Sequence, residues 1–283
     1  MATTTQPRLL RGSQRPSSVE LIAQGIREMW SRRRLARYLI RAQLHKDGAD
    51  TILGNLWWIF DPLLQMGVYV VLVSIIFRSG KPDYPLFVFS AILPWKWFTS
   101  GINDGITSVT SRDTIIKQVK FPKIVLPLAA TVSGVVNFTF GLIPLMALTV
   151  LFYSDRLSPT LLFIPVIAAV QFVFTLAMSI TVSAVNVFFR DIANVARHGL
   201  RLWFYLSPAL YTLSDVEARS PTLGRIVAIN PWTPLFESYR AVVYNKALPD
   251  WGGLAVLLLV SLVLLALAVL FFKRLEPSFA KVL

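Results

Sequence analysis

The chain has 283 residues, of which 55% are hydrophobic, 12% aromatic and only 15% charged. A soluble domain carries about 25% charged residues, so this chain lacks the polar groups needed to cover a water-exposed surface, and its composition predicts a membrane protein. The absence of cysteine excludes disulfides, thiolate metal sites and cysteine nucleophiles, and the two histidines, His45 and His198, lie far apart in sequence, which is unfavourable for a metal site.

The N-terminal segment is polar and does not resemble a cleavable signal peptide, because no apolar core of about 7–15 residues follows its first arginines. We expect residues 1–16 to form a disordered cytoplasmic tail. Ser17 and Glu20 have the spacing of a capping box, which predicts that a helix begins there. Residues 17–55 are expected to form a cytoplasmic region around one amphipathic helix.

That amphipathic helix is basic. Apolar side chains recur at helical spacing from Leu35 to Ala42, and Arg34, Arg37 and Arg41 share a neighbouring face. A helix of this kind lies in the membrane interface, with its arginines toward anionic headgroups and its apolar stripe toward the acyl chains. Two roles remain open for it: a simple anchor beside the first span, or a part of the entrance for a lipid-linked substrate.

Six stretches approach the roughly 20 apolar residues that a helix needs to cross a bilayer. They cover residues 56–77, 84–107, 124–153, 161–188, 200–214 and 252–272. The fifth is short and contains Pro208, whereas the sixth has no ionisable residue and stops at Lys273. The expected fold is therefore an all-α polytopic membrane protein with six transmembrane helices within residues 56–272 and a cytoplasmic tail at 273–283.

Basic residues are distributed unevenly between the two sets of loops. Twenty Lys and Arg fall in residues 1–55, 108–123, 189–201 and 273–283, and seven fall in the opposite loops at 78–83, 154–160 and 215–251. Because cytoplasmic loops are enriched in Lys and Arg, both termini are expected in the cytoplasm. The net charge of +13 then records membrane orientation, and we expect no nucleic-acid partner.

Two internal cytoplasmic loops share a pattern in which an Arg-Asp pair precedes apolar residues at helical spacing. The residues concerned are Arg112, Asp113, Ile115 and Ile116 in the first loop, and Arg190, Asp191 and Ile192 in the second. Each loop is predicted to form a short helix, opened by a polar cap, whose apolar face points away from its own spans. Such a face suits a cytoplasmic partner, and the alternative is a solvated turn that closes a helical hairpin.

The opposite side carries a segment of almost forty residues between the fifth and sixth spans. It includes Asn230, Pro231, Trp232 and Phe236, and is too short and polar to cross the membrane. The prolines indicate breaks near the start of a short helix, and the aromatic rings suit a membrane interface. We expect external re-entrant helices here, serving either as packing material or as a lid on an exit.

Aromatic residues also cluster near the ends of the first and fifth spans. They either belong to the interfacial belts common in membrane proteins or offer rings on which the apolar faces of sugars can stack. Asp61, Lys96 and Asp104 are the few ionisable residues near the spans, and none is clearly at the middle of the bilayer. This scarcity argues against a proton-coupled or sodium-coupled transporter, which needs buried charges along its ion path.

Four short motifs, in order along the chain, carry a family resemblance. They are Leu53-Gly54-Asn55-Leu56-Trp57-Trp58 followed by Asp61-Pro62, then Phe189-Arg190-Asp191-Ile192, then Asn230-Pro231 with Pro234, and finally Leu275-Glu276-Pro277 followed by Phe279-Ala280. With these motifs the chain resembles the type-2 ABC exporter permeases that move O-antigen, teichoic acid, capsule and galactan polymers. The correspondence begins near residue 30.

The resemblance implies a homodimer in the bacterial cytoplasmic membrane, joined to two separate cytoplasmic ATPase subunits. This chain contains no G-x-x-x-x-G-K-[ST] motif, so ATP and Mg²⁺ are expected to bind the partner, and no cofactor or metal is expected here. The resemblance further implies coupling helices at 110–120 and 190–198, an interface helix at 32–46 and external gate helices at 221–248. The aromatic residues proposed for the polymer path are Trp57, Trp58, Trp203, Tyr205 and Tyr211.

The expected substrate is a glycan linked to undecaprenol or another polyprenyl lipid. An ABC exporter of small drugs or lipids shares the same six-span plan and is the alternative within transport. A membrane enzyme such as a lipid-glycan transferase would need converging carboxylates or an Asp-x-Asp metal motif, and the sequence contains neither.

Overall fold

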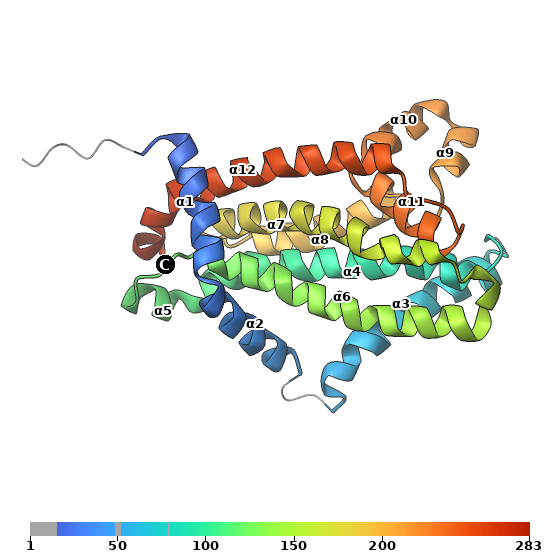
Figure 1. Cartoon of the computed structure of the whole chain (residues 1–283), viewed down its shortest axis with the longest axis horizontal. Coiled ribbons are helices and arrows are strands. Elements are labelled where there is room, and N and C mark those ends of the chain that lie inside the picture. The colour runs from blue at the N-terminus through green and yellow to red at the C-terminus, as the bar shows by residue number, and fades with distance from the viewer. Residues whose placement is uncertain (1–15, 49–51, 79) are drawn as a thin grey trace, which may run out of the picture.

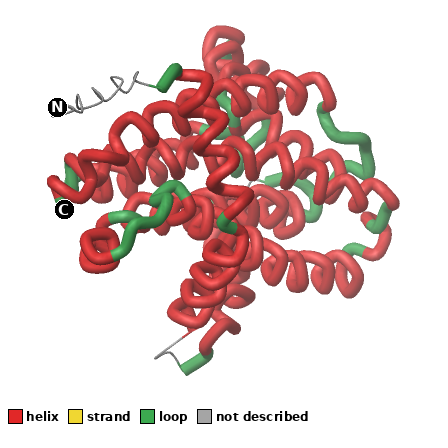
Figure 2. Tube along the Cα trace, turned by 60° about the vertical axis from the view of Figure 1, so that its left-hand side comes forward, coloured by secondary structure: helices red, strands yellow, loops and turns green. Residues whose placement is uncertain are grey.

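The computed structural model describes residues 16–48, 52–78 and 80–283, and every regular element among them is a helix (Figures 1 and 2). The all-α prediction is confirmed for these residues, whereas the expected tail at 1–16 lies outside them except for Pro16. The α-helices are α1 (Ser18–Ser31), α2 (Arg33–Gly48), α3 (Trp57–Val70), α4 (Tyr84–Ser108), α5 (Asp113–Gln118), α6 (Val125–Phe152), α7 (Ile164–Phe188), α8 (Ile192–Leu206), α9 (Leu213–Arg219), α10 (Pro221–Ile229), α11 (Trp232–Val243) and α12 (Trp251–Val282). Short 3₁₀ turns η1 (Gly54–Leu56), η3 (Thr110–Arg112), η4 (Ser154–Arg156) and η5 (Pro159–Phe163) and the π-helical turn η2 (Val71–Ile76) complete the described elements.

Helix α4 lies at the centre of a bundle formed with α3, α6, α7 and α8 (Figure 1). The side chains of its first half, including Leu86, Phe89 and Ile92, are fully buried. The bundle has two ends: the α1 end carries α1, α5 and the C-terminal part of α12, and the α9 end carries α9, α10 and α11 (Figure 1). The first described residues and the C-terminus both lie at the α1 end.

Close packing between α4 and α7 depends on two glycines. A Cβ atom built at Gly105 would clash with the Ser179 hydroxyl oxygen, and one at Gly101 would lie 3.1 Å from the Thr175 methyl carbon. The two backbones approach closely enough for the Ser179 hydroxyl to donate a hydrogen bond to the carbonyl of Gly101 at 3.2 Å. Small residues spaced by four, together with polar side chains bonded across the interface, are how helices associate in membranes.

Four segments are long and apolar enough to cross a membrane. They are Gly54–Ile76, Val125–Phe152, Pro159–Phe188 and Trp251–Val282, and they correspond to the first, third, fourth and sixth predicted spans. The second predicted span, 84–107, coincides with α4, which is not among the four because it carries polar and ionisable side chains such as Lys96, Asn103 and Asp104. Helix α12 continues past the expected end of its span at residue 272, since Phe279 packs on Phe272 and Phe188.

The bounds predicted for the fifth span, 200–214, are wrong. Helix α8 begins eight residues earlier, at Ile192, and ends at Leu206. Ser207, which precedes Pro208, adopts an extended conformation with φ −96° and ψ 151°. A residue before proline avoids the helical region because of steric conflict with the proline ring, so Pro208 ends the helix instead of lying within it.

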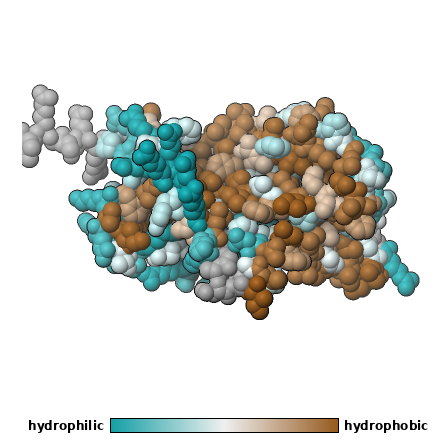
Figure 3. All heavy atoms as spheres, turned by 60° about the horizontal axis from the view of Figure 1, so that its bottom comes forward, coloured by the Kyte–Doolittle hydropathy of each residue, from teal (hydrophilic) through white to brown (hydrophobic). Residues whose placement is uncertain are grey.

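The surface of the bundle carries a wide apolar zone between the two ends. Figure 3 shows brown side chains over the middle of the molecule and teal side chains concentrated on the α1 end, with a smaller teal group at the other end. Exposed side chains such as Leu259 and Val263 on α12 and Ile143 on α6 contribute to this zone. An apolar surface of this extent is stable against lipid and not against water, as expected for a multi-pass membrane protein.

The N-terminal region folds as two helices where one amphipathic helix was predicted. The capping box is confirmed, because the Ser17 hydroxyl accepts a hydrogen bond from the backbone of Glu20 and the Glu20 carboxylate accepts one from the backbone of Ser17. Helix α1 ends at Ser31, and α2 leaves in a new direction and contacts α6 (Figure 1). The arginines of the predicted basic face, Arg34, Arg37 and Arg41, are exposed on α2.

Candidate functional site

A polar groove lies between α3, α4 and α8 on the surface of the molecule. It contains a pocket of about 270 Å³ that carries three cationic side chains and no carboxylate. The lining residues are Gln65, Tyr69, Trp95, Lys96, Thr99, Asn103, Arg197, Leu200, Arg201, Phe204 and Tyr205. The exposed polar face of α4 thus forms the floor of the groove, and α3 and α8 form its two walls.

The charges of the groove are only partly compensated. Lys96 forms an ion pair with Asp61, which ties α4 to α3 and neutralises both groups. Arg197 and Arg201, one turn apart on α8, are exposed and form no hydrogen bond or ion pair with the described residues. An uncompensated arginine is costly in hydrocarbon, so this side of α8 requires water or an anionic group and cannot face lipid chains.

A second pocket, of about 440 Å³, lies on the other side of α3, between α3, α4 and α6. Trp57 and Trp58, both predicted for the polymer path, line it together with Asp61 and Lys96. Its remaining lining residues are Pro62, Leu93, Trp97, Ser100, Asp104, Asn137 and Phe138. The structure therefore brings the paired tryptophans together with the ion pair, at a place separate from the α8 wall of the groove.

Tyr205 and Tyr211, also predicted for the path, lie close to each other, but Tyr205 lines the groove whereas Tyr211 lines a separate pocket beside α9. Tyr205 is 51% exposed, and its hydroxyl lies 3.3 Å from that of Tyr69 on α3. The Tyr211 hydroxyl donates a hydrogen bond of 3.3 Å to the carbonyl of Tyr205. The hydroxyl groups of Tyr205 and Tyr69 thus connect the C-terminal end of α8 with α3.

Trp203, the fifth predicted path residue, is directed into the protein. Its ring packs edge-on against Trp95 at 6.2 Å and against Phe98 at 5.7 Å, within an aromatic cluster of α4, α7, α8 and α11. Its indole N–H donates a hydrogen bond of 3.1 Å to the side-chain oxygen of Asn230. In this protomer Trp203 connects α8 to the segment before α11 and contributes no surface to the groove.

The segment predicted to be external forms three short helices, α9, α10 and α11, and α11 belongs to the core. Trp232 and Phe236 are fully buried, and the Trp232 ring lies 4.7 Å from that of Trp95 and 4.9 Å from that of Phe98. Pro231 directly precedes α11, and the Asn230 side chain accepts a hydrogen bond of 3.0 Å from the backbone of Trp232. Of the two roles left open for these residues, packing is the one that their positions match.

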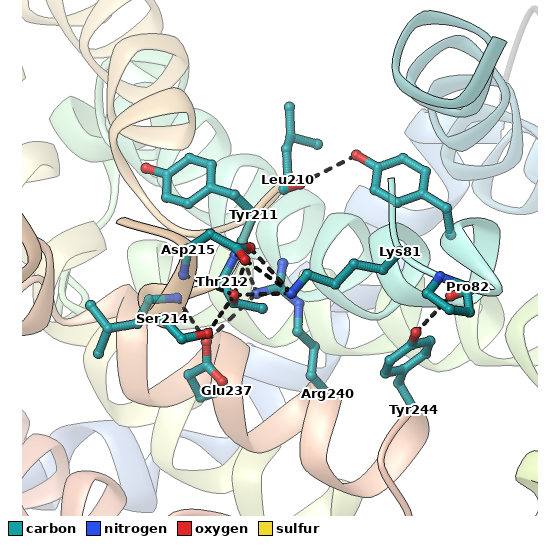
Figure 4. A network of polar contacts seen from close by, with 12 residues as sticks. Lys81, Pro82, Leu210, Tyr211, Thr212, Ser214, Asp215, Glu237, Arg240 and Tyr244 are labelled. Carbon is teal, nitrogen blue, oxygen red and sulfur yellow. Dashed lines mark hydrogen bonds and ion pairs between the residues drawn. The ribbon is translucent and has the colours of Figure 1, made fainter. Parts of the chain in front are cut away.

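A buried arginine holds the segment that follows α8 (Figure 4). Arg240 on α11 is 1% exposed and donates hydrogen bonds to the carbonyls of Ala209 and Tyr211, the latter at 2.9 Å. Its guanidinium carbon lies 4.0 Å from the centre of the Phe87 ring, and Glu237 is 3.8 Å away. Burial lowers the pKa of Arg240 to about 10, which still leaves it cationic at neutral pH.

The same network fixes the start of α9. The Thr212 hydroxyl accepts a hydrogen bond of 3.3 Å from the backbone of Asp215, and Lys81 binds the Asp215 carboxylate at 3.2 Å (Figure 4). Partial burial acts to raise the pKa of Asp215, but the hydrogen bonds from Thr212 and Lys81 outweigh it and lower the pKa below its ordinary value. The burial of Arg240 was not predicted from the sequence, because a charged residue in a segment between two spans is normally expected at the surface.

At the α1 end, the first predicted coupling loop forms η3 and α5. Ile115 is 50% exposed, whereas Ile116 is buried against the bundle, so the expectation that both point outward is wrong for Ile116. Arg112 turns back and donates a hydrogen bond of 3.0 Å to the carbonyl of Ser108. The Asp113 carboxylate accepts a hydrogen bond of 2.7 Å from the backbone of Thr114.

The second predicted coupling loop does not form a separate short helix. Arg190 and Asp191 are exposed, and Ile192 is the first residue of α8, so the loop leads directly into the groove wall. Asp191 makes no side-chain hydrogen bond to α8, so the expected polar cap is absent there, whereas at the first loop the Asp113 carboxylate binds a backbone N–H in the first turn of α5. The exposed apolar side chains here are Phe189 and Val195.

A buried group of charges fastens α1 to the end of α12. Lys273 binds Glu28 of α1 at 2.8 Å and Glu276 at 2.6 Å. The second carboxylate oxygen of Glu276 accepts a hydrogen bond of 2.7 Å from the backbone of Lys123, at the start of α6. Gly25 allows the approach, because a Cβ atom there would clash with a methyl carbon of Val269.

Within residues 16–48, 52–78 and 80–283, no group of three or more His, Asp and Glu side chains is placed to hold a metal ion. The ionisable side chains that line the groove are Lys96, Arg197 and Arg201, and Asp61 beside the groove pairs with Lys96. Such a set of charges suits the binding of polar or anionic molecules, whereas Mg²⁺ and Ca²⁺ are bound by oxygen ligands.

Comparisons with known proteins agree with this architecture. The model of the ABC-2 type transporter family matches residues 34–244. An O-antigen export system permease protein RfbA from Myxococcus xanthus is 34% identical over 256 residues, covering 90% of this chain and 98% of that protein. A protein of the same name from Klebsiella pneumoniae is 30% identical over 235 residues, covering 83% of this chain and 89% of that protein.

Proposed function

Because the chain belongs to the ABC-2 type transporter family, we propose that it exports an O-antigen-like polysaccharide, carried on a polyprenyl lipid, across the bacterial cytoplasmic membrane. The chain is the membrane permease of such a transporter, a transport component without catalytic activity of its own. ATP and Mg²⁺ would bind the separate ATPase subunits that the family employs.

We propose six membrane spans, with α4 and α8 added to the four apolar segments. At about 1.5 Å per residue, the 25 residues of α4 extend over roughly the thickness of a bilayer. The 15 residues of α8 are shorter than a full span, and the segment at 207–212 would complete the crossing. Six spans would place both ends of the chain on one side, and the excess of Lys and Arg at the α1 end supports a cytoplasmic location for that side.

The observation that carries the proposal is the groove between α3, α4 and α8. Its floor is polar, Tyr205 on the α8 wall presents an exposed aromatic ring, and its two unpaired arginines require a wet or anionic environment. Since a groove of this composition cannot face lipid, a second copy of the chain placed over it would enclose a channel. We therefore propose a homodimer in which two such grooves face each other.

The exposed residues of the α1 end are suited to contact the ATPase. Ile115 on α5 and Phe189 beside Arg190 and Asp191 present apolar and charged groups to the cytoplasm. The second of these loops continues into α8, so force applied there would move a wall of the groove. Helix α2, with Arg34, Arg37 and Arg41 exposed, would lie in the inner membrane interface.

Deletion of the gene in its native host, followed by complementation, tests the proposal. Surface polysaccharide should disappear, and lipid-linked polymer should accumulate inside the cell until the intact chain is restored. The double variant Arg190→Ala, Asp191→Ala should be inserted normally but restore little export. Unchanged surface polysaccharide together with lost tolerance to small toxic compounds would instead identify an exporter of drugs or lipids.

A further inference from the structure

Arg197 and Arg201 present two uncompensated positive charges to the groove between α3, α4 and α8. They are four residues apart on α8, so both side chains lie on the same face of the helix. The third cation of the lining, Lys96, already pairs with Asp61. Among the described residues the lining contains no carboxylate, so the groove keeps a net positive charge that an anion would neutralise.

The two guanidinium groups define the kind of anion. The planar fork of an arginine matches the oxygen atoms of a phosphate and binds them through two parallel hydrogen bonds. Each phosphate of a diphosphate ester carries a negative charge, so the two arginines match two adjacent phosphates. On the floor of the groove, the exposed Asn103 adds an amide N–H₂ donor that makes no hydrogen bond with the described residues. The pocket volume of about 270 Å³ is slightly below the range of pockets that enclose a whole small molecule, and suits a compact charged group.

The depth of the arginines separates this site from the layer of phospholipid headgroups. Helix α8 begins at Ile192, and at about 1.5 Å per residue Arg201 lies roughly 14 Å further along the helix. In the proposed orientation Arg201 is therefore below the inner surface of the bilayer, where an unpaired charge is costly. A phosphate group that enters the groove from the cytoplasmic side would offset this cost.

Apolar side chains border the groove on both walls. On α8, Leu202 and Leu206 are exposed on the face next to the arginines. On α3, Leu64 and Val68 are exposed beside the polar residues of the lining. A free phosphate ion would gain nothing from these side chains, whereas a hydrocarbon chain attached to the phosphate can pack on them. The groove therefore combines a charged lining with an apolar border, as binding of a lipid phosphate requires.

We propose that Arg197 and Arg201 bind the diphosphate group of a lipid diphosphate, while the hydrocarbon chain lies on the apolar border of the groove. The inference rests on the proposed export of a polymer carried on a polyprenyl lipid. It assigns to these arginines the recognition of the group that joins the lipid to the polymer. The identity of the sugars can then vary without any change at this site.

The experiment uses the purified full-length chain in a maltoside detergent, which contains no phosphate. The probe is geranylgeranyl diphosphate with a photoreactive diazirine in its isoprenoid chain. Unmodified geranylgeranyl diphosphate, geranylgeraniol, inorganic pyrophosphate and dioleoyl phosphatidylglycerol serve as competitors. We expect labelling of α3 and α8, with the lipid diphosphate competing at least about tenfold better than each of the other three, because it alone combines two phosphates with a hydrocarbon chain.

Arg197→Gln and Arg201→Gln should each weaken competition by geranylgeranyl diphosphate about tenfold or more, since each removes hydrogen bonds to a charged group. Both side chains are exposed and contact no described residue, so neither substitution should change the elution of the folded protein. Arg27→Gln on the exposed surface of α1 is the matched control. It makes the same change in charge outside the groove and should compete like the unmodified chain.

Equal competition by geranylgeraniol would overturn the proposal, because the phosphates would then contribute nothing. Equal competition by pyrophosphate or by phosphatidylglycerol would also overturn it, by identifying a site for a free anion or for an ordinary phospholipid. Unchanged competition in both glutamine variants would show that another group, such as a carboxylate of a second copy, occupies the arginines. Surface polysaccharide in the deletion strain reports on export separately, so a failure of this site and a failure of the proposed function give different results.

Discussion

Replacement of Arg240 by methionine tests the most deeply buried polar contact of the α9 end. The substitution keeps an unbranched side chain but removes the donors that bind the carbonyls of Ala209 and Tyr211. A hydrogen bond to a charged group contributes about 1.5–3 kcal/mol, and two are lost. The loss is partly offset because the variant no longer buries a guanidinium whose Nε lacks a partner.

We therefore expect the segment between α8 and α9 to lose about 2–4 kcal/mol of stability against local opening. This corresponds to a roughly 30- to 1000-fold increase in the open population, at 1.36 kcal/mol per factor of ten. Ala209 is fully buried and the chain has no cysteine, so Ala209→Cys introduces one reporter thiol. Its rate of modification by a membrane-impermeant maleimide measures the opening.

Arg225→Met on the exposed surface of α10 serves as the control and should leave the modification rate unchanged. Arg240→Met, combined with Ala209→Cys, should raise the rate of maleimide modification by the factor given above and should not abolish membrane insertion. An unchanged rate at the reporter thiol in that background would refute the assignment of Arg240 as the residue that holds this segment.

Three further predictions concern other contacts. Gly105→Val should lower the thermal midpoint of the purified protein, since overpacking costs about 1–3 kcal/mol, whereas Gly67→Val, where no atom lies within 4 Å of the added Cβ, should have little effect; equal midpoints would contradict the α4–α7 packing. Lys273→Met should expose α1 to limited proteolysis, because breaking a buried ion pair costs about 3–5 kcal/mol, while exposed Lys281→Met should not, and equal digestion would argue against the attachment. Because the pKa of Asp215 is lowered in the folded state, its contribution to the start of α9 is complete above its ordinary value of 3.8 and lost as pH falls through the lower folded value, so the fluorescence anisotropy of a probe attached to a cysteine in place of Val216 should fall only below about pH 4; a change between pH 5 and 7 would contradict this.

The helical fold and most of the apolar spans could be predicted because they depend on composition and hydrophobic length. The capping box at Ser17 and Glu20 was also predictable, since its signal is local in sequence. The end of α8 was not placed correctly, although Pro208 marked it, because the run of apolar residues continues beyond the proline. Hydrophobicity alone does not distinguish a helix that ends from one that bends.

The orientation of individual side chains was the least predictable feature of the site. Trp203 and Tyr205 are two residues apart on α8, yet one packs among aromatic rings and the other is exposed, which depends on where α4 and α11 lie. Ile116 faces inward for a similar reason, since the neighbouring hydrophobic cluster covers it. The buried contacts of Arg240 and Lys273 join segments that are distant in the chain, so no local sequence pattern predicts them.

Reconstitution into proteoliposomes tests most directly whether the chain moves a lipid-linked polysaccharide with energy from a separate ATPase. The chain is combined with the ATP-binding subunit that copurifies with it from native membranes, and translocation of lipid-linked polymer is measured by its accessibility to an added glycosidase. Translocation is expected only when both subunits, Mg²⁺ and ATP are present. Translocation by the chain alone, or ATP hydrolysis by the complex without movement of the polymer, would contradict it.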